Sequence, residues 1–174
     1  TVILERYASW FAMPDKHAGS STPDGQSVVT PIEQKRNGMS VPVMIDVIGV
    51  GSSAYDFSKD RFNAVPVNFA AGSDAKDKSQ QFGFANIRAE CYWRVREALD
   101  PMNGMNIALP PDPEILGDLA SPRWLVRTNG ITIESKDDIH ERLGRSPDVG
   151  DAIALSFYAN NPSIFDWTQA LRNR

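Results

Sequence analysis

The chain has 174 residues, of which 41% are apolar and 23% are charged, and its formal net charge is -4. This composition excludes disordered and fibrous proteins and predicts one domain with an ordinary core. The negative net charge gives no long-range attraction to nucleic acid, so a polyanionic partner must be held by local basic residues. The apolar runs are too short for a membrane-spanning helix, and no export signal is visible in the sequence. Cys91 is the single cysteine, which excludes an intramolecular disulfide.

The first half of the chain predicts strands that alternate with helices. In chain order we expect a strand at 1–7, a polar loop at 13–26, a helix at 27–37, a strand at 41–47, a helix at 54–61 and a strand at 64–69. Gly38 follows the first helix, as is common where helices end. The run at 41–47 is almost entirely apolar, which is typical of a strand covered on both faces. The last three elements predict a β-loop-α-β unit.

The second half predicts helices around one hairpin. In chain order we expect a polar loop at 71–81, a helix at 86–99, a Pro-rich turn at 109–112, a helix at 114–120, a hairpin of strands 123–128 and 131–135, a helix at 136–143 and a last helix after Ser146. Apolar residues at every fourth position make the helix at 86–99 amphipathic. Asn129-Gly130 predicts the hairpin turn. Ser146 predicts a cap for the last helix, with Pro147 in its first position.

Asp46 is the one carboxylate in the apolar strand at 41–47. Burial of a charge is costly unless the charge is paired or bound to a cation. Two interpretations are open. Asp46 caps the following helix or pairs with a buried arginine, or it is a metal-binding or catalytic carboxylate at the carboxyl end of a strand, where α/β sheets commonly place their sites.

The segment Gly49-Val50-Gly51-Ser52-Ser53-Ala54 fits the dinucleotide-binding pattern G-x-G-x-x-A between a strand and a helix. That pattern also needs an acid about 20 residues further on, to bind the ribose. The next strand ends with Asn68, and Asp74 lies in the polar loop, so the pattern is incomplete. A turn that leaves Asp46 accessible explains the glycines better, because glycine allows close approach of the backbone.

A second acidic group starts the last helix. Asp148 and Asp151 are three residues apart and therefore share a face, so both can bind one cation. Alternatively, the helix dipole alone stabilises acids in a first turn. Because His and Cys are nearly absent, carboxylate ligands favour Mg²⁺ or Mn²⁺ over zinc. Lys136 is a candidate to approach a phosphate or these acids, or it is a surface residue paired with an acid.

Three stretches carry a family resemblance through their order and spacing. They are residues 46–51 with Tyr55-Asp56, residues 86–90 with Tyr92-Trp93 and Arg96-Glu97, and residues 133–152. Together they resemble the nuclease domain of the large terminase subunit of tailed bacteriophages. The resemblance covers residues 1–159, and we expect residues 160–174 to be a tail or linker. It implies an α/β fold with an RNase H-like mixed central sheet flanked by helices.

The resemblance implies a two-metal-ion endonuclease that cuts concatemeric viral double-stranded DNA during genome packaging, with Mg²⁺ or Mn²⁺ held by an acidic triad. By motif, Asp46 resembles the strand carboxylate and Asp151 the helical one. Asp148 is then an auxiliary metal ligand and Lys136 a further catalytic candidate. The first triad acid and its strand map ahead of Thr1, so we expect this chain alone to bind metal weakly and cut DNA poorly.

The resemblance also implies partners. These are double-stranded DNA, an upstream ATPase motor in the same polypeptide, the portal and the small terminase subunit, in the cytoplasm of a bacterial host and without a membrane. The motor's G-x-x-x-x-G-K-[ST] pattern does not occur in these residues. The alternative of a different class is a non-catalytic α/β module, such as a prophage remnant, that binds a nucleotide or only docks.

Overall fold

The computed structural model describes residues 1–103 and 105–158. The described strands are β1 (Val2–Ile3), β2 (Arg6–Tyr7), β3 (Trp10–Phe11), β4 (Asp15–Lys16), β5 (Val43–Asp46), β6 (Ala64–Val67), β7 (Trp124–Arg127) and β8 (Gly130–Ile133). The described helices are α1 (Gly25–Arg36), α2 (Val50–Ser58), α3 (Ile87–Leu99), α4 (Pro113–Ala120), α5 (Lys136–Leu143) and α6 (Asp148–Leu155), with 3₁₀ turns η1 (Gly19–Ser21) and η2 (Pro101–Asn103). The tail predicted at 160–174 lies outside the described residues.

The described strands pair in four two-stranded sheets. β5 and β6 are parallel, whereas β1–β4, β2–β3 and β7–β8 are antiparallel. The expected α/β class is confirmed. The mixed central sheet is not, because β1 and β5 do not pair with each other in the described part of the chain.

The predicted β-loop-α-β unit is formed by β5, α2 and β6. Its helix begins at Val50, earlier than the predicted start at residue 54. Gly49 adopts a positive φ of 67° and turns the chain directly out of the strand. A Cβ atom on residue 51 would collide with the carbonyl oxygen of Asp46, so only glycine permits this tight start. The helix therefore begins within four residues of Asp46.

The amino-terminal region differs from the expected single strand and loop. The segment 1–7 is divided into β1 and β2, and the predicted loop 13–26 contains β4 and the start of α1. Asp24 caps α1 by accepting a hydrogen bond from the backbone N–H of Ser27 at 2.8 Å. Because this capping box satisfies the first-turn donors, the helix starts before residue 27.

The second half follows the predicted order with two corrections at its turns. In the hairpin, Arg127 pairs with Gly130, so the turn residues are Thr128 and Asn129 and not Asn129-Gly130. Ser146 does not cap α6, since its hydroxyl donates instead to the Asp148 carboxylate at 2.7 Å. The residue preceding α6 is Pro147, which provides no side-chain cap.

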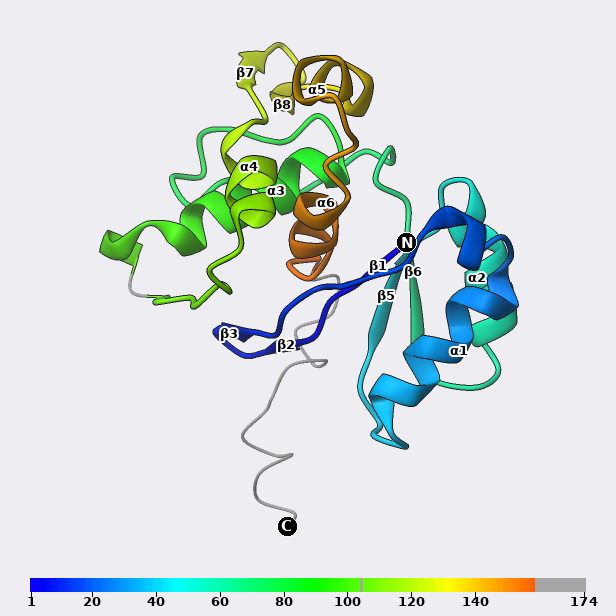
Figure 1. The fold of residues 1–174 in the computed structure, drawn as a ribbon. Helices are drawn as coiled ribbons and strands as arrows, with labels where there is room; N and C mark the ends of the chain where they lie inside the picture. The colour runs from blue at the N-terminus through cyan, green and yellow to red at the C-terminus, as the bar shows by residue number, and fades with distance from the viewer. Residues whose placement is uncertain (104, 159–174) are drawn as a thin grey trace.

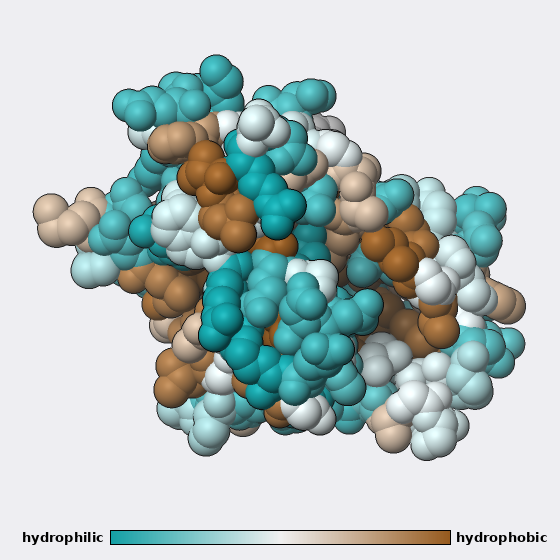
Figure 2. Space-filling model, turned by 90° about the horizontal axis from the view of Figure 1, so that it is seen from above, coloured by the Kyte–Doolittle hydropathy of each residue, from teal (hydrophilic) through white to brown (hydrophobic). Residues whose placement is uncertain are grey.

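The helices pack on both sides of the β5–β6 pair. Figure 1 shows α1 and α2 on one side and the group of α3, α4 and α6 on the other. The larger core joins α3 to α6 through buried side chains such as Cys91, Val95 and Ile153, and a second core joins α1 to α2 and β5. Seen from above, the face that includes α5 is largely hydrophilic, and its apolar residues form separate patches (Figure 2). None of the helices in the described ranges is long and apolar enough to cross a bilayer.

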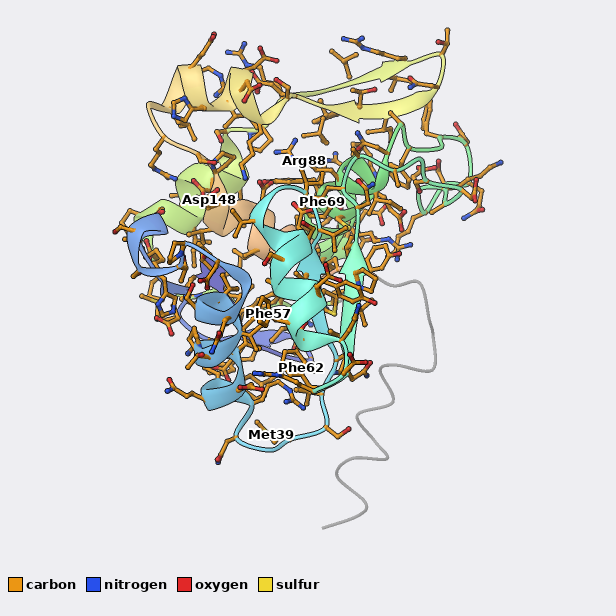
Figure 3. All side chains as sticks on the ribbon, turned by 90° about the vertical axis from the view of Figure 1, so that its right-hand side faces the viewer. Met39, Phe57, Phe62, Phe69, Arg88 and Asp148 are labelled. Carbon is orange, nitrogen blue, oxygen red and sulfur yellow. The ribbon has the colours of Figure 1, made fainter. Side chains whose placement is uncertain are left out.

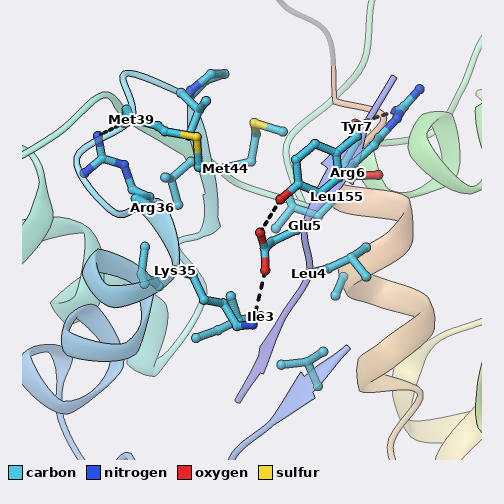
Figure 4. Close-up of a pocket in the computed structure, with 17 residues that line it drawn as sticks. Ile3, Leu4, Glu5, Arg6, Tyr7, Lys35, Arg36, Met39, Met44 and Leu155 are labelled. Atoms are coloured by element: carbon cyan, nitrogen blue, oxygen red, sulfur yellow. Dashed lines mark hydrogen bonds and ion pairs between the residues drawn. The ribbon is translucent and has the colours of Figure 1, made fainter. Parts of the chain in front are cut away.

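A groove of about 210 Å³ separates the β1–β2 segment from β5 (Figure 4). Residues of α1 and α6, including Ile32 and Leu155, form the rest of its wall. The Glu5 carboxylate lies at the groove and accepts hydrogen bonds from Lys35 at 3.2 Å and from the Tyr7 hydroxyl at 2.6 Å. The two strand segments line this groove together and do not pair with each other in the described part of the chain.

Candidate active site

The structure brings all four predicted site residues to one place. Asp46 ends β5, Lys136 begins α5, and Asp148 and Asp151 lie in the first turn of α6. The Lys136 ammonium is 3.1 Å from Asp148 Oδ1 and 3.0 Å from Asp151 Oδ2. Asp46 is close enough for the charges of Asp151 and Lys136 to shift its pKa. Residues that are about 100 positions apart in sequence therefore share one electrostatic environment.

Asp46 carries a poorly compensated charge. Burial raises the pKa of its carboxyl group, and the nearby Asp151 carboxylate adds to the rise. The backbone N–H of Ile48, 3.3 Å from Oδ1, opposes this rise in pKa, as do the charge of Lys136 and the backbone N–H of Phe69. Within the described ranges Asp46 forms no ion pair within 4 Å and gives no side-chain cap to α2. Both structural interpretations of this acid, as a helix cap and as an arginine partner, are therefore wrong for the described residues.

Asp151 is surrounded by donors. Its Oδ1 accepts from the Tyr92 hydroxyl at 2.8 Å and from Arg88 Nε at 3.1 Å, and its Oδ2 contacts Lys136. The Arg88 guanidinium also donates to the Glu134 carbonyl oxygen at 2.8 Å and lies 4.8 Å from the centre of the Tyr92 ring. With 13% of its side chain exposed, Asp151 is held in one orientation by these contacts.

Arg88 and Tyr92 are site residues that the sequence analysis did not select. They lie at i, i+4 on α3, so their side chains emerge from one face. Burial, and next the Asp151 carboxylate, raise the pKa of the Tyr92 phenol well above its ordinary value, so the hydroxyl stays protonated and donates. An arginine and a tyrosine four residues apart on an amphipathic helix were the signal available in the sequence.

Lys136 and Asp148 form the exposed part of the site. Burial acts to lower the pKa of the Lys136 amine, but the Asp151 and Asp148 carboxylates outweigh it and raise the pKa. For Asp148, burial acts to raise the pKa, but the Ser146 hydroxyl and Lys136 outweigh it and lower the pKa. Both groups are therefore charged at neutral pH.

Asp148 and Arg88 lie at the same end of the molecule, and Met39 lies at the opposite end (Figure 3).

Comparisons with known proteins identify the fold. No protein-family model and no curated protein matches the sequence. Among solved structures, the nuclease domain of the large terminase subunit of bacterial virus Sf6 matches with a TM-score of 0.66 at 15% identity, covering 91% of this chain and 81% of that chain. The chain has the fold of a terminase nuclease domain.

Two further matches are lysine-to-alanine variants of the same viral domain. The variant with manganese has a TM-score of 0.67 at 15% identity and covers 91% of this chain and 83% of that chain. The variant with calcium has a TM-score of 0.66 at 15% identity and covers 90% of this chain and 81% of that chain. The terminase nuclease fold thus spans nearly all of the described residues.

The donor set in this terminase-like fold suits a hard cation. Asp46, Asp148 and Asp151 supply carboxylate oxygens, which Mg²⁺ and Mn²⁺ prefer. In the described part of the chain, however, no group of three or more His, Cys, Asp or Glu side chains is arranged to hold a metal ion. Lys136 and Arg88 contact the Asp151 oxygens, so a cation must compete with these two side chains for the same atoms.

Proposed function

We propose that this chain is a metal-dependent endonuclease domain of a phage large terminase subunit, which cuts concatemeric viral double-stranded DNA during packaging. One observation carries the proposal. Asp46 from the end of β5 and Asp151 from α6 meet beside Lys136, in a chain with the fold of a terminase nuclease domain. A partly buried carboxylate that forms no direct ion pair among the described residues, as is the case for Asp46, is costly to the fold, and binding of a cation would reduce that cost.

The roles of the individual residues follow from their environments. Asp46 and Asp151 hold the metal, and Asp148 is an auxiliary ligand at the exposed edge. When bound, a pair of Mg²⁺ or Mn²⁺ ions supplies an activated water and neutralises charge on the phosphate. Arg88 and Tyr92 orient Asp151 by hydrogen bonds. Lys136, half-exposed and charged, is placed to contact a DNA phosphate once a cation has taken its carboxylates.

The proposed site is completed by a further carboxylate. The resemblance places the first triad acid on a strand ahead of Thr1, and an RNase H-like central sheet would include that strand. Two observations support this part of the proposal. The described residues lack a three-ligand cluster, and β1 and β5 line a groove together without pairing. Residues 1–174 alone are therefore proposed to bind divalent metal weakly.

The proposed partners are double-stranded DNA, an ATPase motor in the same polypeptide, the portal and the small terminase subunit, all within the bacterial cytoplasm. They rest on the family resemblance and on the likeness to a viral terminase domain. The manganese and calcium in the neighbouring structures support dependence on a divalent cation.

Calorimetric titration with Mn²⁺ and, separately, with NAD tests the proposal against the nucleotide-binding alternative. We expect weak, saturable Mn²⁺ binding that is lost in the double variant Asp46→Asn, Asp151→Asn, and no binding of NAD. A variant that is charge-matched but distant from the site, Asp56→Asn with Glu33→Gln, serves as the control and should bind Mn²⁺ as the unmodified chain does. Binding of NAD without binding of Mn²⁺ would overturn the nuclease proposal.

A further inference from the structure

A fully buried carboxylate on a neighbouring helix binds the start of α6. Asp118, on α4, has 0% of its surface exposed. Its Oδ2 accepts hydrogen bonds from the backbone N–H groups of Val149 at 3.1 Å and Gly150 at 3.0 Å. Its Oδ1 is 2.5 Å from Arg145 Nη1, so the charge is paired. Asp118 therefore acts as a cap from more than thirty residues away.

Helix α6 needs such a cap because its own sequence provides none. The first N–H groups of a helix have no partner within the helix. Pro147, at the position before the helix, makes no side-chain cap, and the Ser146 hydroxyl is directed to Asp148. The Asp118 carboxylate satisfies two of these N–H groups and places a negative charge at the positive end of the helix dipole.

The same turn of α6 packs tightly against the site. A Cβ atom on residue 150 would lie 2.9 Å from Asp118 Cβ and 3.1 Å from the Tyr92 hydroxyl oxygen, so glycine allows α6 to approach both α3 and α4. That hydroxyl donates to Asp151 Oδ1. A direct series of contacts thus runs from Asp118 through Gly150 and Tyr92 to Asp151.

We propose that Asp118 is a positioning residue, which fixes the first turn of α6 and so directs the Asp151 carboxylate toward Asp46. The metal-binding consequence of this inference rests on the proposed function, whereas its consequence for the orientation of Asp151 does not. Asp118 itself contacts neither metal nor substrate. Its effect passes through the backbone of residues 149–150.

The experiment compares Asp118→Ala, Asp118→Asn and the matched control Asp112→Ala by NMR. Asp112 caps α4 itself, accepting from the Glu114 N–H at 2.7 Å, so its loss perturbs the same helix without removing the contacts to α6. The first measurement is the amide signals of Gly150 and Asp151 and the hydroxyl and ring signals of Tyr92. The second is the broadening of these signals by added Mn²⁺, which detects weak binding.

We expect Asp118→Ala to shift the signals of Gly150, Asp151 and Tyr92 and to weaken the Mn²⁺ response by about 10- to 100-fold, as is common for residues that orient metal ligands. Asp118→Asn keeps an acceptor oxygen and should recover part of both effects. Asp112→Ala should leave both unchanged.

Unchanged Asp151 and Tyr92 signals in a folded Asp118→Ala, or equal shifts in Asp112→Ala, would overturn the positioning role. If Asp118→Ala does not fold, the Asp118→Asn variant provides the test. Unshifted Asp151 and Tyr92 signals together with an unaltered Mn²⁺ response in Asp118→Asn would contradict the inference. If the unmodified chain shows no Mn²⁺ response, the proposed function fails, and the signal shifts still test the positioning role alone.

Discussion

The two sides of the candidate site differ in how their carboxylates are compensated. On the strand side, Asp46 accepts from the backbone N–H groups of Ile48, at 3.3 Å, and Phe69, and the charge of Lys136 acts on it without forming an ion pair among the described residues. On the helix side, Asp151 has the hydroxyl of Tyr92 and the cationic groups of Arg88 and Lys136 within 3.1 Å. The strand side therefore carries a costly charge, whereas the helix side is oriented and neutralised by its own neighbours.

This difference indicates how the two sides respond to a cation. Under the proposed function, a cation at Asp46 would meet a carboxylate that the protein stabilises by backbone donors and by the charge of Lys136, without a direct ion pair in the described residues, so most of the electrostatic gain would appear as binding. At Asp151 a cation must displace Lys136, and part of the gain is lost. The helix side thus holds its carboxylate in a fixed orientation, and the strand side has more unfavourable charge for a cation to relieve. Four predictions test this contrast, from the largest expected effect to the smallest.

Asp151→Asn should abolish the Mn²⁺ binding of the chain, a loss of at least about 100-fold. Substitution of a residue that only orients a metal ligand already weakens metal binding by about 10- to 100-fold, and this substitution removes the charge of a proposed ligand itself. Asp148→Asn, on the same helix face, should weaken binding by only a few fold, since Asp148 is exposed and auxiliary. Calorimetry with Mn²⁺ measures both. Equal losses in the two variants, or a loss confined to Asp148→Asn, would show that Asp148 is the principal ligand.

Arg88→Leu should lower the free energy of unfolding by about 2 kcal/mol, less than for a fully buried pair because 12% of the Arg88 side chain is exposed. The substitution leaves Asp151, with 13% of its side chain exposed, without its guanidinium partner, so that Lys136 is its remaining cationic contact among the described residues. Urea unfolding measures the change. Arg61→Leu, which breaks the exposed pair with Glu33, is the control and should change stability by less than about 0.5 kcal/mol. Similar losses of stability in the two variants would contradict the conclusion that the ion pair of Arg88 contributes more to stability than an exposed ion pair does.

Lys136→Met should tighten Mn²⁺ binding by about two- to fivefold, the range expected for removing a competing, partly exposed ion pair. Under the proposed function it should also abolish any DNA cleavage. Lys59→Met is the matched control, because Lys59 is 47% exposed and paired with Asp56, while Lys136 is 48% exposed. Weaker Mn²⁺ binding in Lys136→Met would mean that this lysine supports the metal site and does not compete with it.

Asp46→Asn should stabilise the fold slightly at neutral pH. Because burial raises the pKa of Asp46, the folded chain holds this proton more tightly than the unfolded chain. The resulting stability is present below the ordinary carboxyl pKa of about 3.9 and is lost as pH rises through the folded pKa. Asparagine has no proton to lose, so the gain of the variant over the unmodified chain should grow between pH 4 and pH 7.5 in urea unfolding.

The control for this measurement is Asp56→Asn, an exposed acid on the adjacent helix, which should show no such growth with pH. If Asp46→Asn proved less stable than the unmodified chain at pH 7.5, the Asp46 carboxylate would have a compensating partner, and the contrast between the two sides would be wrong.

Local patterns in the sequence predicted the elements that local forces determine. The helix at 86–99 followed from its apolar spacing, and the β5-α2-β6 unit followed from an apolar run and its glycines. The family resemblance predicts that Asp46 and Asp151 share one site, and the approach of Lys136 to the acids is one of the two interpretations that the sequence leaves open for that residue. Whether they perform the proposed chemistry is a prediction that the substitutions above test.

Long-range partners account for what the sequence did not reveal. The sequence predicts that Ser146 caps α6, yet the side chain that accepts from the first-turn N–H groups of α6 is Asp118. Nothing in the local sequence distinguishes Asp118 from any other residue of a short helix. Likewise, the sequence alone predicts that Tyr92 is a core aromatic residue, and only the structure shows that its hydroxyl donates to Asp151. No spacing rule connects these residues, because the contacts arise only when α3, α4 and α6 pack together.

The groove between β1–β2 and β5 bears on the solubility of the protein. The backbone N–H and C=O groups of successive residues in a strand point to opposite sides. Thr1 hydrogen-bonds to His17, next to β4, and Val43 hydrogen-bonds toward β6. The backbone groups of the neighbouring Val2 and Met44 therefore point away from β4 and β6, respectively. A strand edge whose backbone groups are exposed and unpaired can pair with a second extended chain and lead to aggregation, and charged side chains beside an edge oppose such pairing. The ion pair between Glu5 and Lys35 borders this opening, so we expect it to oppose pairing of a second chain at these edges in a concentrated solution.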